Sequence, residues 1–256
     1  MSLDNLTALE PLIGGYWHVA IVFFRVSALV SVLPAFGAST LPTRIKLVAA
    51  FSFTAIVAPA VPAVPEPEGL AGLALFAVAE ATIGLAMGLG IRLLVLALQT
   101  AGSIAGQSTS LSQIFGTAGM DPIPAMGQVL VFAALALAIV AGLHIRAAEF
   151  LILSYDMLPI GQFPDPAGLS QWGIRQIARS FSLAFVLAAP FVITAVIYNL
   201  ALGAINRAMP QMMVAFVGAP LITFGGLFLL FVASPMLLTV WIDALMGFFE
   251  NPVRMN

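Results

Sequence analysis

Long stretches almost free of charged side chains are what most constrain the fold of this chain. Several of them reach or exceed the roughly 20 apolar residues that a helix needs to cross a bilayer core of about 30 Å. They are Leu12–Phe36, Ile45–Val64, Gly69–Leu98, Ile123–Leu143, Ser180–Ile205 and Met212–Ile242. Hydrophobic residues make up 61% of the chain and charged residues only 8%, too little polar surface to cover a soluble globule. The sequence therefore predicts an all-α integral membrane protein, with one domain over residues 1–256.

Two of these stretches are longer than one crossing requires. The last one contains Pro220 and Pro235, and proline removes a backbone hydrogen-bond donor, so a broken helix is predicted there. The third one carries Gly84 and Gly88, a small-residue pair that lets backbones approach. We expect either a chain reversal or a close helix contact at these glycines.

The positions of the basic side chains predict the orientation. Lys and Arg concentrate on the cytoplasmic side of membrane proteins, which assigns Arg44 with Lys46, and the loop Arg146–Arg179, to the cytoplasm. Strict alternation of single crossings would place that loop outside, so Gly69–Leu98 is predicted to enter and return as a hairpin. The N-terminus is then outside and the C-terminus cytoplasmic.

A polar segment, residues 99–122, interrupts the apolar stretches. Its sequence is QTAGSIAGQSTSLSQIFGTAGMDP, rich in Gly, Ser and Thr. Loops of this length inside a compact domain are usually functional or disordered. The composition predicts a loop with a function, and an exposed connector is the alternative.

Three charged residues lie within the apolar stretches and away from their ends, namely Arg25, Glu80 and Arg92. A charge at bilayer depth is costly and usually faces a partner or an aqueous path. Glu80 and Arg92 would be about 18 Å apart on one straight helix, so their partners are expected on other helices or subunits. A proton relay would need several acids at depth, so we favour charges that lock neighbouring helices together.

The residues needed for most enzyme sites are scarce. The chain has no cysteine and only two histidines, His18 and His144, without metalloprotease spacing. No nucleophile elbow and no phosphate-binding loop with its lysine is present. We therefore expect neither catalysis nor a metal or other cofactor, and no basic patch indicates nucleic-acid binding.

Several motifs together resemble one family. The opening FFRVSALVSVLPAFGASTLPTRIKLVAAF, the glycines after Glu80 and the block YNLALGAINRAMPQMMVAFVGAPL are similar to the flagellar biosynthetic protein FliR family over almost the whole chain. The most specific part is a polar motif inside an apolar sequence. It consists of Asn199, Asn206, Arg207, Pro210 and Gln211.

The resemblance implies a subunit of the export gate of a flagellar type III secretion system in the bacterial inner membrane. It implies helical hairpins packed into a hetero-oligomeric bundle with two smaller hydrophobic proteins in several copies, next to the gate's switch and large export subunits. Unfolded proteins would pass through the channel. Contacts with other helices or subunits are expected at Arg25, Glu80, Arg92 and the polar motif.

The family's plug loop maps onto the polar segment, where glycines allow bending and apolar side chains could fill a lumen. The candidate plug residues are Gly106, Gln107, Leu111, Ile114, Phe115, Gly116, Met120, Asp121 and Pro122. Three alternatives remain open. The chain could be the equivalent subunit of a virulence secretion system, a secondary transporter with inverted repeats, or a scaffold whose polar segment faces no lumen.

Overall fold

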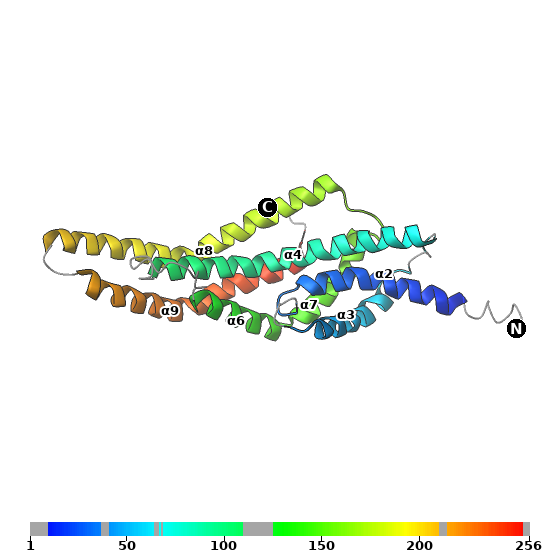
Figure 1. Cartoon of the computed structure of the whole chain (residues 1–256), viewed down its shortest axis with the longest axis horizontal. Helices are drawn as coiled ribbons and strands as arrows, with labels where there is room; N and C mark the ends of the chain where they lie inside the picture. The colour runs from blue at the N-terminus through cyan, green and yellow to red at the C-terminus, as the bar shows by residue number, and fades with distance from the viewer. Residues whose placement is uncertain are drawn as a thin grey trace, which may run out of the picture. The chain divides into compact units, whose positions relative to one another are not determined.

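The computed structural model describes residues 10–36, 41–63, 67, 69–109, 125–209 and 214–252. Within these ranges the chain is helical and contains no strand, which confirms the predicted all-α class. The elements in chain order are α2 (Glu10–Val32), α3 (Thr43–Val57), the short 3₁₀ helix η1 (Ala58–Ala60), α4 (Gly69–Thr109), α6 (Ala125–Val140), α7 (Leu143–Met157), α8 (Pro166–Ala208) and α9 (Val214–Glu250) (Figure 1).

The chain divides into two compact units. Unit 1 consists of Met1–Arg92, Ala141–Gln176 and Gly247–Asn256, and unit 2 of Leu93–Val140 and Ile177–Met246. The chain passes from one unit to the other within α4, α8 and α9, and once between α6 and α7.

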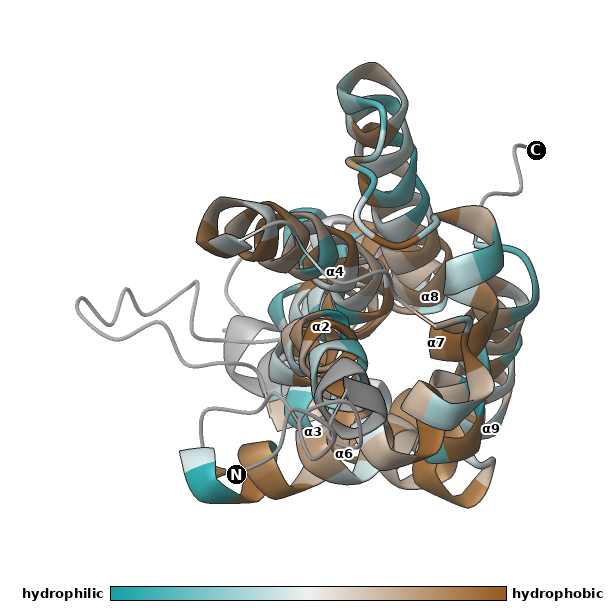
Figure 2. Ribbon diagram, turned by 90° about the vertical axis from the view of Figure 1, so that its right-hand side faces the viewer, coloured by the Kyte–Doolittle hydropathy of each residue, from teal (hydrophilic) through white to brown (hydrophobic). Residues whose placement is uncertain are grey.

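Four of the described helices are long and apolar enough to cross a membrane, or up to five crossings if α6 and α7 form one broken span. The four are Thr43–Ala60, α4, α8 and Pro220–Glu250. Apolar residues colour most of the helical ribbon brown to pale brown in Figure 2. Length and hydropathy together agree with a membrane protein.

Unit 1 is built around α2. Ile21, Val22 and Val26 of this helix are fully buried. Phe23 of α2 stacks on Phe51 of α3, with ring centroids 4.7 Å apart. A stacked aromatic pair adds to the attraction between two helices, although Phe51 itself remains 59% exposed, so α2 and α3 form one packed pair.

Unit 2 is built around the second half of α4. Two successive carbonyl groups of this helix accept side-chain hydrogen bonds: Leu93 from Ser180 of α8 at 2.6 Å and Leu94 from the fully buried Trp241 of α9 at 2.8 Å. A further hydrogen bond, from the Tyr198 hydroxyl to the Gly218 carbonyl, joins α8 to α9. Hydrogen bonds between apolar helices fix the position of one helix along the axis of the other.

The predicted break in the last apolar stretch is wrong, because α9 runs through both Pro220 and Pro235. Proline at 235 removes the N–H that would bond the carbonyl of Phe231. The hydroxyl of Ser234 donates to that carbonyl instead, at 3.2 Å, and such re-satisfaction lets proline stay within a membrane helix. A break is found elsewhere, between α6 and α7, which are bent by 69° relative to each other. Gly142 has φ +83° at this break, a left-handed conformation that glycine adopts without strain.

Two other expectations about the chain path are also wrong. Gly69–Leu98 does not turn back but lies within the single helix α4. Arg146–Arg179 is not a loop, since it contains most of α7 and the start of α8. The apolar run in α7 is packed inside unit 1, where Phe150 and Leu151 are buried. One face of α7 therefore belongs to the core of unit 1, whereas Leu153 and Met157 are exposed.

Candidate functional site

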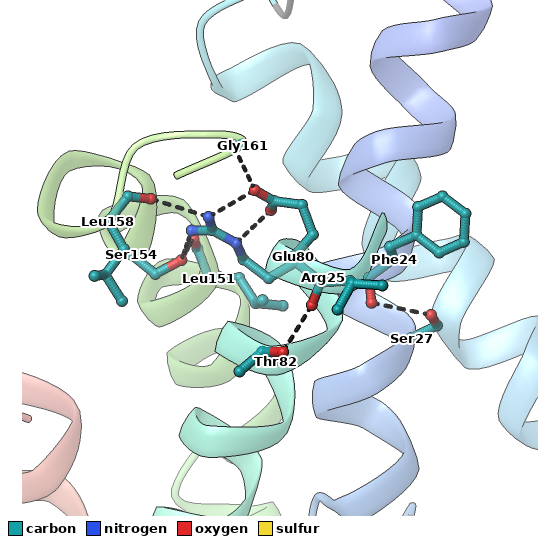
Figure 3. Close-up of polar contacts among 10 residues, drawn as sticks. Phe24, Arg25, Ser27, Glu80, Thr82, Leu151, Ser154, Leu158 and Gly161 are labelled. Atoms are coloured by element: carbon teal, nitrogen blue, oxygen red, sulfur yellow. Dashed lines mark hydrogen bonds and ion pairs between the residues drawn. The ribbon is translucent and has the colours of Figure 1, made fainter. Parts of the chain in front are cut away.

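An ion pair between Arg25 of α2 and Glu80 of α4 lies inside unit 1 (Figure 3). Nε of Arg25 donates to Oε2 of Glu80 at 2.7 Å, and Nη2 donates to Oε1 at 3.1 Å. Both side chains are fully buried. Two parallel bonds of this kind give an arginine–carboxylate pair its strongest and most directional geometry.

The end of α7 completes the partners of this pair. Nη1 of Arg25 donates to the Ser154 hydroxyl at 3.0 Å, and Nη2 donates to the Leu158 carbonyl at 2.9 Å. The backbone N–H of Gly161 donates to Oε1 of Glu80 at 3.0 Å. The cluster of Arg25, Glu80, Ser154, Leu158 and Gly161, which we name the buried cluster, joins α2, α4, α7 and the turn after α7 (Figure 3).

The aromatic ring of Tyr155 covers one face of the arginine. The Cζ atom of Arg25 lies 3.8 Å from the ring centroid, a cation–π contact that gains strength away from water. The Tyr155 hydroxyl is buried, and no described residue forms a hydrogen bond with it.

Glycines allow the backbones around the buried cluster to come close. Gly161 has φ +73°, and a Cβ atom there would lie 1.9 Å from the ring of Phe76. A Cβ on Gly84 of α4 would lie 2.2 Å from the Arg25 carbonyl oxygen, and a Cβ on Gly88 would lie 3.0 Å from the Leu29 carbonyl oxygen. These two glycines are therefore a close helix contact between α4 and α2, the second of the two expectations for this pair.

Hydrogen bonding and burial together limit the chemistry available to the buried cluster. The nitrogen atoms of Arg25 and the carboxylate oxygens of Glu80 are all hydrogen-bonded, and neither side chain reaches solvent. Breaking such a pair leaves a buried charge without compensation. The geometry fits a fixed junction between helices better than a proton relay. In the ranges that the structure describes, no three His, Cys, Asp or Glu side chains are placed to hold a metal ion.

A second junction lies in unit 2, at the end of α4. The Thr109 hydroxyl donates to the Ala105 carbonyl at 3.0 Å and lies 3.9 Å from the Met126 sulfur of α6. Thr223 of α9 donates to the Thr109 carbonyl at 3.3 Å, and a Cβ on Gly226 would lie 2.6 Å from Cγ2 of Thr109. We name Thr109, Met126, Thr223 and Gly226 the α4-end junction, since it joins α4, α6 and α9.

The first part of the predicted loop is helical. Residues 99–109 belong to α4, so the expected bending at Gly102 and Gly106 does not occur there. A Cβ on Gly102 would lie 2.2 Å from the Cα of Gly127 in α6, which means that this glycine serves close packing of two helices. Gln107 is exposed on α4. The other candidate plug residues lie outside the described residues: Leu111, Ile114, Phe115, Gly116, Met120, Asp121 and Pro122.

The other predicted contact residues lie apart from the buried cluster. Asn199, Asn206 and Arg207 are exposed on the second half of α8 in unit 2. Arg92 is exposed on α4, and no described carboxylate forms an ion pair with it. Pro210 and Gln211 lie outside the described residues.

Sequence reasoning did not single out the α7 side of the buried cluster. Ser154 and Tyr155 occur next to each other in the apolar run LILSYDM, and a polar pair in such a run is a signal for a partner inside the protein. Thr109 was missed because it lies in the Ser/Thr-rich segment, where a single threonine does not stand out.

Comparison with known proteins gives a consistent result. The family model described as "Bacterial export proteins, family 1" matches residues 16–247. A flagellar biosynthetic protein FliR from Caulobacter vibrioides is 33% identical over 228 residues, covering 88% of this chain and 91% of the relative. Relatives with the same name from Escherichia coli and Aquifex aeolicus are 31% and 29% identical, covering 83% and 97% of this chain and 82% and 95% of their own length.

Proposed function

This chain belongs to the bacterial export proteins of family 1, with flagellar FliR proteins as its relatives, and from that membership we propose that it is a subunit of the export gate of the flagellar type III secretion system. It is a membrane protein of flagellar protein export. Its more specific role, in this proposal, is to help form and close the channel through which unfolded flagellar proteins leave the cell.

The length of the helices is the structural observation that supports this proposal. With 41, 43 and 37 residues, α4, α8 and α9 are about 61, 64 and 55 Å long at a rise of about 1.5 Å per residue. The hydrocarbon core of a bilayer is only about 30 Å thick. Helices of this length extend well beyond the bilayer unless they lie strongly tilted.

The exposed apolar surface is longer than the bilayer as well. In unit 2, large exposed apolar side chains occur along α8 from Ile177 to Ile205, among them Phe181, Phe185 and Leu200. This face is about 42 Å long, and still about 40 Å across the membrane at the average helix tilt of about 20°. Apolar surface outside the hydrocarbon core needs cover from protein, which supports assembly with other apolar subunits.

The partners in this proposal are membrane subunits of the same gate. They are two smaller hydrophobic proteins present in several copies, with the switch and large export subunits next to them. The assembly lies in the inner membrane. Arg44 and Lys46 support a cytoplasmic connection between α2 and α3 and hence an N-terminus outside; the cytoplasmic C-terminus is part of the proposal without the hairpin in α4 as its ground. Exposed amides on α8 support protein neighbours for this helix, because an amide facing lipid lacks hydrogen-bond partners.

The closure of the idle channel is assigned to residues 110–122, which include the candidate plug residues from Leu111 to Pro122; Gly106 and Gln107 belong to the helix α4 and are not part of it. The α4-end junction supports this assignment, because Thr109 and Met126 hold the two ends of the segment next to each other. A segment with joined ends can be displaced by a passing chain without separating α4 from α6. A scaffold whose segment faces no lumen is the competing hypothesis, and only the closure predicts an ion leak after deletion.

The first test is the mass of the intact complex after co-expression with the neighbouring membrane genes. We expect a large hetero-oligomer that contains this chain in detergent, because its exposed apolar faces need protein cover. Native mass spectrometry of the purified complex gives both composition and copy number. A stable monomer or homodimer would contradict the export-gate proposal and favour a transporter.

The double variant Asn206→Leu/Arg207→Leu is expected to lower recovery of the partner membrane subunits. Each interhelical hydrogen bond in a membrane is worth about 1 kcal/mol or less, so we expect a partial loss and a smaller effect for each single substitution. Co-purification from detergent, quantified against this chain, measures it. The control is Ile205→Leu, an apolar exchange at a neighbouring exposed position. Undiminished recovery with the double variant would mean that these side chains do not contact a partner.

A further inference from the structure

An exposed stripe of unit 1 runs along the first half of α4. Its members follow one another at alternating intervals of four and three residues, which is a 3.5-residue repeat. Four large apolar members, Leu75, Val78, Leu85 and Leu89, are between 41% and 56% exposed. The full stripe, which we name the α4 seam, is Ala71, Leu75, Val78, Thr82, Leu85, Leu89 and Arg92, all exposed except Thr82, which is half-buried.

The repeat of the α4 seam suits another helix as its partner. Two helices with apolar positions at this spacing pack by inserting each side chain into a hole of the facing helix, at a crossing angle of about 20°. Membrane helix bundles use the same geometry. Thr82 fits such a seam, because its hydroxyl already donates to the Val78 carbonyl at 2.7 Å and needs no outside partner.

Arg92 decides what kind of partner the seam can take. It is the last member of the seam and is exposed, and among the described residues no carboxylate pairs with it. A guanidinium on an apolar helix face is costly against lipid and is strongly favoured against a carboxylate, which it can bind with two hydrogen bonds. The seam itself contains no acidic residue, so a second copy of this chain packed through the same seam would not supply that carboxylate.

We propose that the α4 seam binds a helix of another membrane subunit and that this helix carries an Asp or Glu opposite Arg92. The apolar positions provide packing, and the ion pair sets the register of the two helices, as a single polar seam position does in coiled coils. The inference rests on the proposed function in one respect, namely that the partner is a subunit of the same gate.

Single-cysteine variants test the seam, since the natural chain has no cysteine. Leu75→Cys, Leu85→Cys and Leu89→Cys are labelled with a benzophenone maleimide in the co-expressed complex and irradiated. We expect all three to cross-link to one helix of the same identified subunit, in the order that the repeat dictates. Ile56→Cys, on the exposed side of α3, is the control and should not cross-link to that helix.

Charge reversal tests the role of Arg92. Arg92→Glu should lower the Leu89→Cys cross-link several-fold, Arg92→Lys should retain most of it, and reversing the acidic residue of the partner should restore it in the Arg92→Glu background. Cross-links to lipid or to a second copy, or an unchanged yield with Arg92→Glu, would overturn the inference. If the hetero-oligomer were still intact in that case, the proposed function would stand. Absence of any hetero-oligomer would instead reject the proposed function.

Discussion

The variant Arg25→Met is expected to lose about 3–5 kcal/mol of unfolding free energy, because it leaves the buried carboxylate of Glu80 without its counter-ion. The methionine fills much of the volume of the arginine stem, so the loss comes from electrostatics and hydrogen bonding. The Leu158 carbonyl also loses the donor that it has in the native chain. All four side-chain hydrogen bonds of Arg25 are lost in this variant.

The companion variant Glu80→Gln is expected to be destabilised to a similar extent, because the guanidinium of Arg25 then lacks a carboxylate in a site closed to water. The double variant Arg25→Met/Glu80→Gln should be more stable than either single variant. It buries no charge, and the glutamine oxygen can still accept the hydrogen bond from the Gly161 N–H.

Unfolding of the purified chain in mixed micelles with increasing dodecyl sulfate measures these differences. The matched control is Arg146→Gln, which breaks an ion pair with Glu149 whose two side chains are 50% and 53% exposed. An exposed pair of this kind contributes within about 0.5 kcal/mol, so the control should unfold as the native chain does. If Arg25→Met behaved like the control, the buried cluster would not hold unit 1 together.

The membrane class and the positions of most helices could be predicted from the sequence, because apolar runs of spanning length have few other uses. The run Ile123–Leu143, for example, corresponds to α6 at Ala125–Val140. Helix ends could not be read from hydropathy in the same way. The polar residues after Leu98 end the apolar run but not the helix, since Ala101, Ala105 and Thr109 bury one side of α4 within unit 2.

The start of α8 carried a signal that hydropathy overlooks. Pro166 occupies the first helical position, and the carboxylate of Asp165 accepts backbone hydrogen bonds from Ala167 and Gly168 at 3.4 and 2.7 Å. Asp followed by Pro is a common helix start. The Asp165–Pro166 pair therefore predicts a helix that begins at Pro166. The positive charges of Arg175 and Arg179, taken alone, suggested a cytoplasmic loop in the same segment.

The buried cluster shows why a site is harder to predict than a fold. Arg25, Glu80 and the Gly84–Gly88 pair stand out in the sequence because charge and small residues are rare in apolar helices. Their pairing with each other, and with Ser154 across 129 residues, depends on how three helices pack. No periodicity within one helix contains that information.

Deletion of Ile114–Met120 is expected to leave the complex assembled and to raise the ion permeability of membranes that contain it. The proposed closure is lost, whereas the α4-end junction at Thr109 and Met126 and the exposed contact residues of α8 remain. A closure that is in place about nine-tenths of the time or more limits the leak, so its loss should raise the leak by about tenfold or more. Growth inhibition by small ions and sugars, together with dye release from vesicles, measures the leak.

A replacement of the same length separates closure from strain. Residues 114–120 exchanged for an equal number of Gly and Ser keep the reach between α4 and α6 but remove the apolar side chains of Ile114, Phe115 and Met120. If apolar side chains shut the lumen, as hydrophobic constrictions do by excluding water, the replacement should leak as the deletion does. If the deletion variant leaked ions but the Gly/Ser replacement did not, the leak of the deletion would come from a shortened segment that pulls the helices apart. Loss of assembly in both variants would show that the segment belongs to the framework, and the plug assignment would then fall.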